Sequence, residues 1–284
     1  MTRWIQVTAV LERAPEDWAV LCDVFDRHGI PGTVQTDQPP TLSGYLVDSA
    51  DSEGKVDLLR ADLLQFGAKE VTETVVPDED WAESWKQFFK PREIGERFLV
   101  RPTWEEPPAV SDRLEIVLDP GQAFGTGDHP TTRLCLELME RVWKGLDLRP
   151  EVADIGCGSG ILTVAACLLG CKSAVGVDID AVSVNSAKEN GERNAVAFEV
   201  FEGTGFDPLP ADASYDVVLS NIISAALIAL APEASRRVRI GGFWIVSGII
   251  EGNWKDVEAA AVRNGFAFTD FQQEGDWVAA TFLR

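Results

Sequence analysis

Residues 152–160, Val152-Ala-Asp-Ile-Gly-Cys-Gly-Ser-Gly160, indicate the fold of this 284-residue chain more directly than any other stretch. They end an apolar strand in a glycine-rich turn and then open a helix, and ligands bind at the carboxyl end of such strands. Glycines allow a close approach of the backbone to the ligand. A dinucleotide-binding loop has the spacing G-x-G-x-x-G, whereas here Ile161 stands in place of the third glycine. Gly156, Gly158 and Gly160 therefore predict an α/β fold whose ligand site differs from a dinucleotide site.

Strands and helices alternate on both sides of this loop, with no internal repeat. We expect strands at 152–155, 174–177, 217–220, 243–247 and 277–283, and helices at 131–143, 161–169, 181–194, 227–238 and 253–264. Such alternation builds a mostly parallel, doubly wound sheet. Residues 111–284 are therefore predicted to form a Rossmann-like domain.

The first part of the chain has a different order of predicted strands and helices. Strand-like runs at 4–11, 33–36, 42–47 and 70–76 flank two amphipathic segments, 16–28 and 55–66. The order β-α-β-β-α-β predicts a small α+β, ferredoxin-like domain over residues 1–76. Residues 77–110, with a short aromatic helix at 78–89, are interpreted as the connection between the domains.

Two acidic residues accompany the glycine loop. Asp154 lies two residues before its first glycine, where a carboxylate would oppose a pyrophosphate but tolerates a ligand that carries an ammonium and a sulfonium. Asp178 ends the next strand, where an acidic side chain can accept both hydroxyls of a ribose. S-adenosylmethionine has all of these groups, so the loop and the two acids together predict this cofactor.

A third strand, Asp216-Val-Val-Leu-Ser-Asn221, runs into the floor of the same predicted cleft. In aminomethyltransferases a polar residue at this place can accept a hydrogen bond from the incoming amine and aim its lone pair at the methyl carbon. The stretch lacks the Pro-Pro-aromatic sequence that stacks a flipped adenine, and no Pro-Cys pair supplies a thiolate for attack on a pyrimidine. Asn221 is therefore the main catalytic candidate.

Residues 118–132 are rich in glycine and hydroxyl side chains and lead into a helix. Ahead of the first strand of the sheet, this segment can fold over a cofactor as a lid, which makes Phe124, Gly125 and Thr126 candidate cofactor contacts. His129 could contact the substrate or remove a proton, although a lone histidine is more often structural.

Composition limits the partners. With 46 acidic and 25 basic side chains the net charge is −21, which disfavours bare RNA or DNA and favours a basic partner, or simply keeps the protein soluble. Five cysteines and two histidines give neither a disulfide framework nor a metal pattern, so no metal is expected. Without a signal-peptide pattern or a long apolar run, we expect a cytoplasmic protein, and a monomer.

Four stretches together resemble the ribosomal protein L11 methyltransferase family. They are Asp119-Pro-Gly-x-Ala-Phe-Gly-Thr-Gly-x-His-Pro-Thr-Thr132, Asp154-x-Gly-Cys-Gly-Ser-Gly-Ile-Leu162, Gly176-x-Asp-Ile-Asp180 and Asn221-Ile-Ile223. The resemblance covers nearly the whole chain. It implies cofactor contacts from Thr132, Gly156, Asp178 and Asn221. It also implies that the N-terminal domain holds a ribosomal protein whose lysine side chains, α-amino group or both are methylated.

The predicted reaction is an in-line displacement, in which a neutral amine attacks the sulfonium methyl carbon. A lysine amine has a pKa near 10.4 in water and must first lose its proton. The sequence offers no obvious general base, so we expect deprotonation through water. Alternative hypotheses are a lysine methyltransferase of another protein, such as the β subunit of an electron-transfer flavoprotein, and a small-molecule N-methyltransferase or an RNA methyltransferase. A cofactor-binding module without activity is a further alternative.

Overall fold

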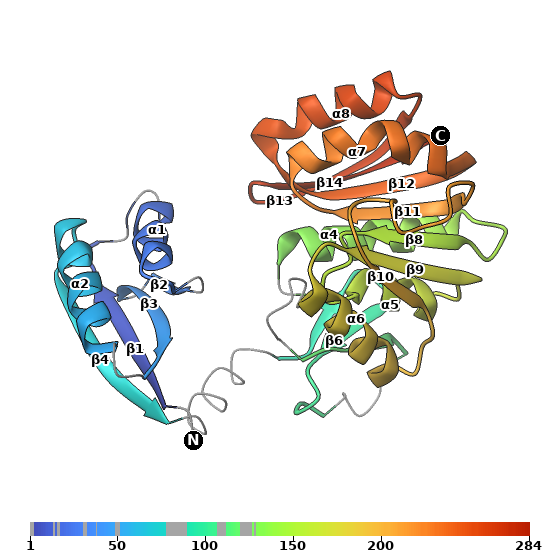
Figure 1. The fold of residues 1–284 in the computed structure, drawn as a ribbon. Coiled ribbons are helices and arrows are strands. Elements are labelled where there is room, and N and C mark those ends of the chain that lie inside the picture. Colours follow the sequence, from blue (N-terminus) through green and yellow to red (C-terminus); the bar gives the residue numbers. More distant parts are fainter. Residues whose placement is uncertain are drawn as a thin grey trace. The chain divides into compact units, whose positions relative to one another are not determined.

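The computed structural model describes residues 3–13, 15, 18–30, 33–37, 39–48, 52–77, 90–106, 112–119, 127 and 129–284. The chain divides into two compact units, Met1–Phe89 and Lys90–Arg284 (Figure 1). The helix expected at 78–89 lies outside the described residues.

The first unit contains six elements in the predicted order. They are β1 (Arg3–Val10), α1 (Ala19–Arg27), β2 (Thr33–Asp37), β3 (Pro40–Val47), α2 (Ser52–Gln65) and β4 (Glu70–Pro77). The strands form an antiparallel sheet of order β2-β3-β1-β4. Alternate β1 residues, Ile5, Val7 and Ala9, are buried in a core with Phe25 of α1 and Leu59 of α2. This alternation is the pattern of a sheet with one face covered by helices.

The second unit begins earlier than the sequence indicated, because residues 90–106 belong to it. They contain β5 (Arg92–Ile94) and β6 (Phe98–Arg101), which pair with β7 (Leu114–Val117) in a three-stranded sheet. The buried carboxylate of Glu140 accepts hydrogen bonds from the backbone N–H groups of Glu96 and Arg97, each at 2.8 Å. This contact fastens the β5–β6 turn to the larger unit, so the interpretation of all of 77–110 as a connection was wrong.

A seven-stranded sheet of order β10-β9-β8-β11-β12-β14-β13 forms the centre of the second unit (Figure 1). Its strands are β8 (Glu151–Ile155), β9 (Ser173–Asp178), β10 (Glu199–Glu202), β11 (Tyr215–Asn221), β12 (Val238–Ile250), β13 (Ala267–Glu274) and β14 (Trp277–Leu283). The five strands from β10 to β12 are parallel, β14 runs antiparallel to β12, and the edge strand β13 pairs antiparallel with β14. The prediction of a mostly parallel, doubly wound sheet is confirmed.

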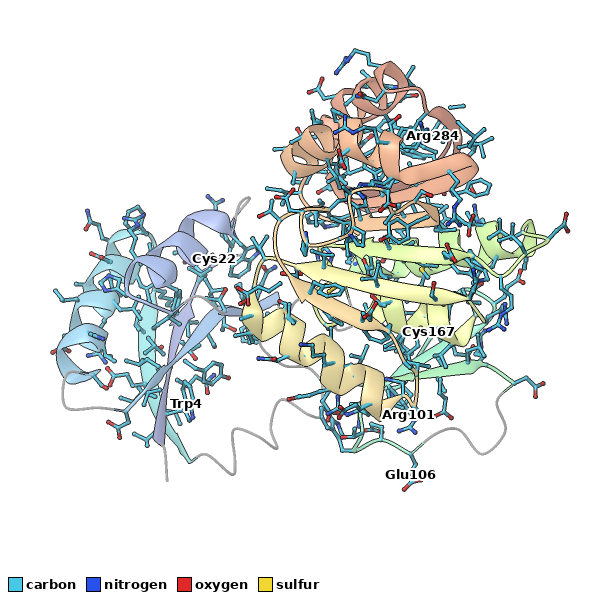
Figure 2. All side chains as sticks on the ribbon, turned by 45° about the vertical axis from the view of Figure 1, so that its right-hand side comes forward. Trp4, Cys22, Arg101, Glu106, Cys167 and Arg284 are labelled. Carbon is cyan, nitrogen blue, oxygen red and sulfur yellow. The ribbon has the colours of Figure 1, made fainter. Side chains whose placement is uncertain are left out.

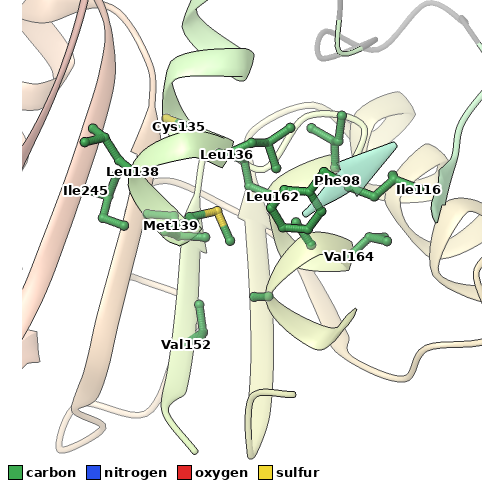
Figure 3. Packing of buried hydrophobic residues seen from close by; sticks show 14 of the residues in the cluster. Phe98, Ile116, Cys135, Leu136, Leu138, Met139, Val152, Leu162, Val164 and Ile245 are labelled. Carbon is green, nitrogen blue, oxygen red and sulfur yellow. The ribbon is translucent and has the colours of Figure 1, made fainter. Parts of the chain in front are cut away.

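Five α-helices of this unit are described: α4 (Pro130–Lys144), α5 (Ile161–Leu168), α6 (Ala181–Arg193), α7 (Ser224–Arg237) and α8 (Trp254–Arg263); a short 3-10 helix, η2 (Glu251–Asn253), precedes α8. Helices α4 and α5 share one apolar core with β5–β7, in which Phe98, Leu136 and Leu162 are almost completely buried (Figure 3). Helices α7 and α8 share a second core with Trp244 and Phe282. The two cores take alternate residues of the same strands, so the sheet is buried on both faces.

Candidate active site

The strand order places a switch point beside β8. From β8 the chain continues to β9 and β10 on one side, whereas β11 and β12 lie on the other (Figure 1). Ligands of open α/β sheets bind outside the carboxyl ends of the strands at such a point. The predicted residues of β8, β9 and β11 all lie on or at the ends of these neighbouring strands, so the fold brings them to one edge.

The glycine loop after β8 has a backbone that few other residues could adopt. Gly156, Gly158 and Gly160 have φ values of 81°, 53° and 78°, in the left-handed region. A Cβ on Gly156 would lie 2.2 Å from Cγ2 of Ile222, and a Cβ on Gly160 would lie 2.9 Å from Cβ of Ala187. Gly156 and Gly160 are therefore required by both conformation and space, whereas Gly158 is favoured by its conformation, and the two close approaches come from residues that follow later in the chain.

Asp178 at the end of β9 is tied to the loop. Its Oδ2 accepts a hydrogen bond from the N–H of Gly158 at 2.8 Å, and its Oδ1 accepts one from the N–H of Asp180 at 3.0 Å. The side chain is only partly buried. Each carboxylate oxygen has lone pairs left for further donors, such as sugar hydroxyls.

Asp154 is completely buried beneath the loop. Its Oδ2 accepts a hydrogen bond from Oγ1 of Thr163 at 2.6 Å, whereas its buried Oδ1 has no hydrogen-bond partner. Burial raises the pKa of this carboxyl to about 7, Thr163 opposes the shift, and the charge of Asp178 adds to it. A buried acceptor without a donor is costly, so a cationic or N–H ligand that reaches it would be stabilised.

Asn221 at the end of β11 contacts the first turn of α4. Its Nδ2 donates to Oγ1 of the fully buried Thr132 over 3.5 Å, at the limit of a hydrogen bond. Its Oδ1 is buried and has no partner. The structure therefore brings Asn221 and Thr132 together and leaves an acceptor available for a donor from outside the described residues.

His129 is the N-cap of α4. Its Nδ1 lies 2.8 Å from Oγ1 of Thr131 and accepts from the N–H of Thr131 at 3.3 Å, and its ring packs edge-on against Trp277 with 4.8 Å between ring centroids. Burial, together with the nearby charge of Arg133, lowers its pKa, while Glu274 opposes the shift. These contacts are those of a helix cap. Phe124, Gly125 and Thr126 lie outside the described residues.

Helix α6 supplies residues that the sequence did not single out. Nδ2 of Asn190 donates to the carbonyl of Ser159 in the glycine loop at 2.8 Å. Asn194, which ends the helix, accepts from the N–H of Val117 at 2.7 Å and donates to the carbonyl of the same residue at 2.8 Å. The only signal in the sequence is a pair of asparagines four residues apart in the last turn of a predicted helix, which is common at helix ends.

Cys157 has a packing position in the glycine loop. Cys157 is buried within the loop and lies 3.0 Å from the position of a Cβ on Gly176, and burial raises the pKa of its thiol. All five thiols are free, among them Cys22 of the first unit and Cys167 of the second (Figure 2). Among the described residues no group of His, Cys, Asp and Glu is arranged for a metal, and none of the helices there is long and apolar enough to span a membrane.

The residues of the site fit S-adenosylmethionine. The unpaired Oδ1 of Asp154 suits an ammonium, and the partly exposed carboxylate of Asp178 suits ribose hydroxyls. The positive φ values of the three glycines give a tight loop whose backbone can approach a ligand. The fold and the site define a Rossmann-like methyltransferase that depends on S-adenosylmethionine.

The comparisons with known proteins name the family. The model of the family described as ribosomal protein L11 methyltransferase (PrmA) matches residues 9–284, and the chain belongs to this family. The chain is 40% identical over 272 residues to the ribosomal protein L11 methyltransferase of Pelotomaculum thermopropionicum, which covers 93% of this chain and 83% of the relative. It is 42% identical to that of Pelobacter propionicus over 214 residues, which are 74% of this chain and 69% of the relative.

A crystal structure is also similar. The ribosomal protein L11 methylase of Lactobacillus delbrueckii subsp. bulgaricus aligns with a TM-score of 0.63 and 30% sequence identity. The alignment covers 69% of this chain and 99% of that chain.

Proposed function

We propose that this enzyme transfers methyl groups from S-adenosylmethionine to lysine side chains, the N-terminal α-amino group, or both, of ribosomal protein L11. The observation that carries the proposal is the unpaired, buried Oδ1 of Asn221 at the carboxyl end of β11. An amide oxygen there can accept one N–H of an amine and orient its lone pair. The acceptor is taken from the relatives, whose names specify ribosomal protein L11.

The protein's contribution is binding and orientation. Asp154, Asp178, Thr132 and the loop from Gly156 to Gly160 hold the cofactor, and Asn221 orients the amine. Bound S-adenosylmethionine supplies an activated methyl group on a good leaving group, so little covalent help is needed. Orientation and exclusion of water lower the barrier by several kcal/mol. The contacts of His129 fit a helix cap, so we assign it structural support of Thr132 rather than proton transfer, which leaves deprotonation to water.

The first unit is assigned to recognition of the acceptor. Its element order and the sheet order β2-β3-β1-β4 support a ferredoxin-like domain within Met1–Phe89. The net charge of −21 suits a basic ribosomal protein and opposes bare nucleic acid. We place the enzyme in the cytoplasm, where ribosomal proteins are found, and propose that it acts as a monomer. On the grounds of the sequence, we propose Phe124, Gly125 and Thr126 as further cofactor contacts.

The proposal is tested by incubating the full chain with S-adenosylmethionine and purified ribosomal protein L11, and by measuring the mass of the intact acceptor. We expect the mass to rise in steps of one methyl group, with peptide fragmentation locating the groups on amines. The β subunit of an electron-transfer flavoprotein serves as a parallel acceptor. Methylation of that protein alone would contradict the assignment of the acceptor, and methylation of neither would contradict a protein N-methyltransferase activity.

A further inference from the structure

Two isoleucines are exposed on the β11–β12 half of the carboxyl edge of the large sheet, and a further one, Ile179 (73% exposed), follows β9 on the cofactor side. Ile223, two residues after β11, is 71% exposed, and Ile250, the last residue of β12, is 48% exposed. Exposed apolar side chains at a ligand-binding edge are available for contact with a partner.

The backbone keeps the two strand ends close together. Asn221 pairs with Ser247 in the parallel β11–β12 ladder, and the N–H of Ile222 donates to the carbonyl of Ser247 at 3.2 Å. Gly248 has a φ of 82°, and a Cβ on it would lie 2.4 Å from the carbonyl oxygen of Ile222. The ends of β11 and β12 are therefore packed directly against each other beside Asn221.

Two carboxylates flank Ile250. Glu251 follows it in the chain, and the N–H of Glu251 donates to the carbonyl of Asp276 at 2.8 Å, while Ile250 pairs with Trp277 in the β12–β14 ladder. Both acidic side chains are exposed. Within the part of the chain that the structure describes, neither forms an ion pair, whereas the neighbouring Glu274 is paired with Arg133. The two free charges are available to a cation from a partner.

The geometry of in-line methyl transfer favours the β11–β12 half of the carboxyl edge as the place where the acceptor amine enters. The glycine loop and Asp178 belong to β8 and β9, so the cofactor lies on that side of β11. An amine that attacks in line must come from the side opposite to the leaving sulfur. On the far side of Asn221 this edge consists of the ends of β11 and β12 and the start of β14, where Ile223, Ile250, Glu251 and Asp276 are found.

We propose that Ile223, Ile250, Glu251 and Asp276 form the docking surface for a basic, lysine-bearing segment of the acceptor protein. The isoleucines cover the aliphatic stem of a lysine side chain, and the carboxylates attract the cationic residues around it. The inference rests on the proposed function and deepens it by locating the acceptor on the catalytic unit.

The charges are tested with the double variant Glu251→Lys/Asp276→Lys. Its control is Asp212→Lys/Glu199→Lys, which makes the same charge change at two exposed residues before β11 and at the start of β10. We expect the first variant to raise the KM for ribosomal protein L11 about tenfold at low salt and by much less at high salt. The Kd for S-adenosylmethionine should stay within about twofold. The control should change neither constant by more than that. Equal effects of the two variants would contradict a local docking surface.

The apolar part is tested with Ile223→Ser and Ile250→Ser, against Ile240→Ser at an 82% exposed position near the other end of β12. We expect the first two to raise the KM about three- to tenfold without a change in cofactor affinity, and the control to change neither constant. An unchanged KM in both would overturn the proposal.

The experiment separates failure of the surface from failure of the proposed function. If the wild-type enzyme does not methylate ribosomal protein L11, the proposed function fails, and the surface is then tested by binding of a fluorescent lysine-rich peptide. Its affinity should fall about tenfold in Glu251→Lys/Asp276→Lys and remain unchanged in the control. A peptide that binds both variants equally would overturn the docking surface independently of activity.

Discussion

The two halves of the carboxyl edge are built differently. On the β8–β9 side, the loop is fixed by positive φ values, by contacts that leave no space for a Cβ, and by hydrogen bonds to Asp178 and Asn190. On the β11–β12 side, the proposed acceptor surface is made of exposed side chains such as Ile223 and Glu251 at the strand ends. The cofactor half depends on backbone shape, so substitutions of its loop glycines and of Asp178 should have large effects. The acceptor half depends on area and charge, so its effects should be smaller and graded.

The largest effect is expected from Gly156→Ala. The new Cβ would lie 2.2 Å from Cγ2 of Ile222, at a φ of 81° that itself costs about 1–2 kcal/mol for a residue other than glycine. We expect cofactor affinity, measured by calorimetry, to fall about a hundredfold or more. The control is Gly170→Ala, which has a φ of 86° but no atom within 4 Å of a new Cβ. If both variants lose only stability and bind the cofactor equally well, the loop does not contact it.

The next effect is expected from Asp178→Ala. Hydrogen bonds to a charged group contribute about 1.5–3 kcal/mol, so the Kd for S-adenosylmethionine should rise roughly ten- to a hundredfold. Asp180→Ala is the control, because it removes an exposed carboxylate two residues away that caps α6. We expect it to lower the free energy of unfolding by about 1 kcal/mol and to leave the Kd unchanged. Normal cofactor affinity in a folded Asp178→Ala variant would remove Asp178 from the site.

A pH effect is expected from Asp154, whose pKa is raised by burial to about 7. At pH values between the unfolded and the folded pKa, the folded cofactor-free protein keeps this proton, whereas the unfolded chain has lost it. The stabilisation from protonated Asp154 is therefore complete below the unfolded pKa and is lost as the pH rises toward about 7. An ammonium at Oδ1 favours the carboxylate, so cofactor binding should release close to one proton at about pH 6 and almost none well above pH 7.

Calorimetric titrations in two buffers with different ionisation enthalpies count the protons released. Asp154→Asn has no carboxyl to ionise and should abolish the release. Equal proton release in the variant and the wild type would mean that another group titrates.

The smallest effect is expected at the end of α6. Asn194→Ala removes the two hydrogen bonds to Val117 and the bond from Nδ2 to the carbonyl of Asn190. Asn264→Ala removes only the equivalent helix-end bond, to the carbonyl of Ala260 at 2.8 Å in α8. We expect Asn194→Ala to weaken cofactor binding about two- to fivefold, through Asn190 and the glycine loop, and Asn264→Ala to leave it unchanged. Identical cofactor affinities would show that α6 does not position the loop.

The sequence predicted the helices and strands whose apolar residues recur at regular spacing or whose ends carry a turn signal. The glycine loop, the central parallel strands and their helices occur where the alternation placed them. The short strands β5, β6, β7 and β10 and the edge strand β13 were missed, because strands of three or four residues carry little period and β13 is largely exposed. The carboxylate of Glu140 in α4 accepts hydrogen bonds from the β5–β6 turn, more than forty residues earlier in the chain. A contact between residues so far apart cannot be predicted from local sequence patterns.

The residues of the candidate site also include some that the sequence predicted and some that it did not. Gly156, Asp178 and Asn221 were predicted because loop spacing and strand ends place them at one edge, and the structure brings them there. Asn190 and Ile222 were not predicted, since their roles depend on which distant backbone they meet. The contacts of His129 with Thr131 and Trp277 are those of a cap and a packing residue, and its part in catalysis stays a prediction.

The central claim is that Asn221 lies where the two halves meet and orients the acceptor amine. It is tested most directly by the single-turnover rate of methyl transfer to ribosomal protein L11 in Asn221→Ala, at saturating cofactor, alongside the Kd for S-adenosylmethionine. An interaction made mainly in the transition state lowers the rate, whereas one made equally in the ground state weakens binding. We predict a rate lower by about 1–3 kcal/mol of barrier, with only part of that loss in cofactor affinity. A variant that binds the cofactor normally and transfers methyl groups at the wild-type rate would contradict this account of the active site.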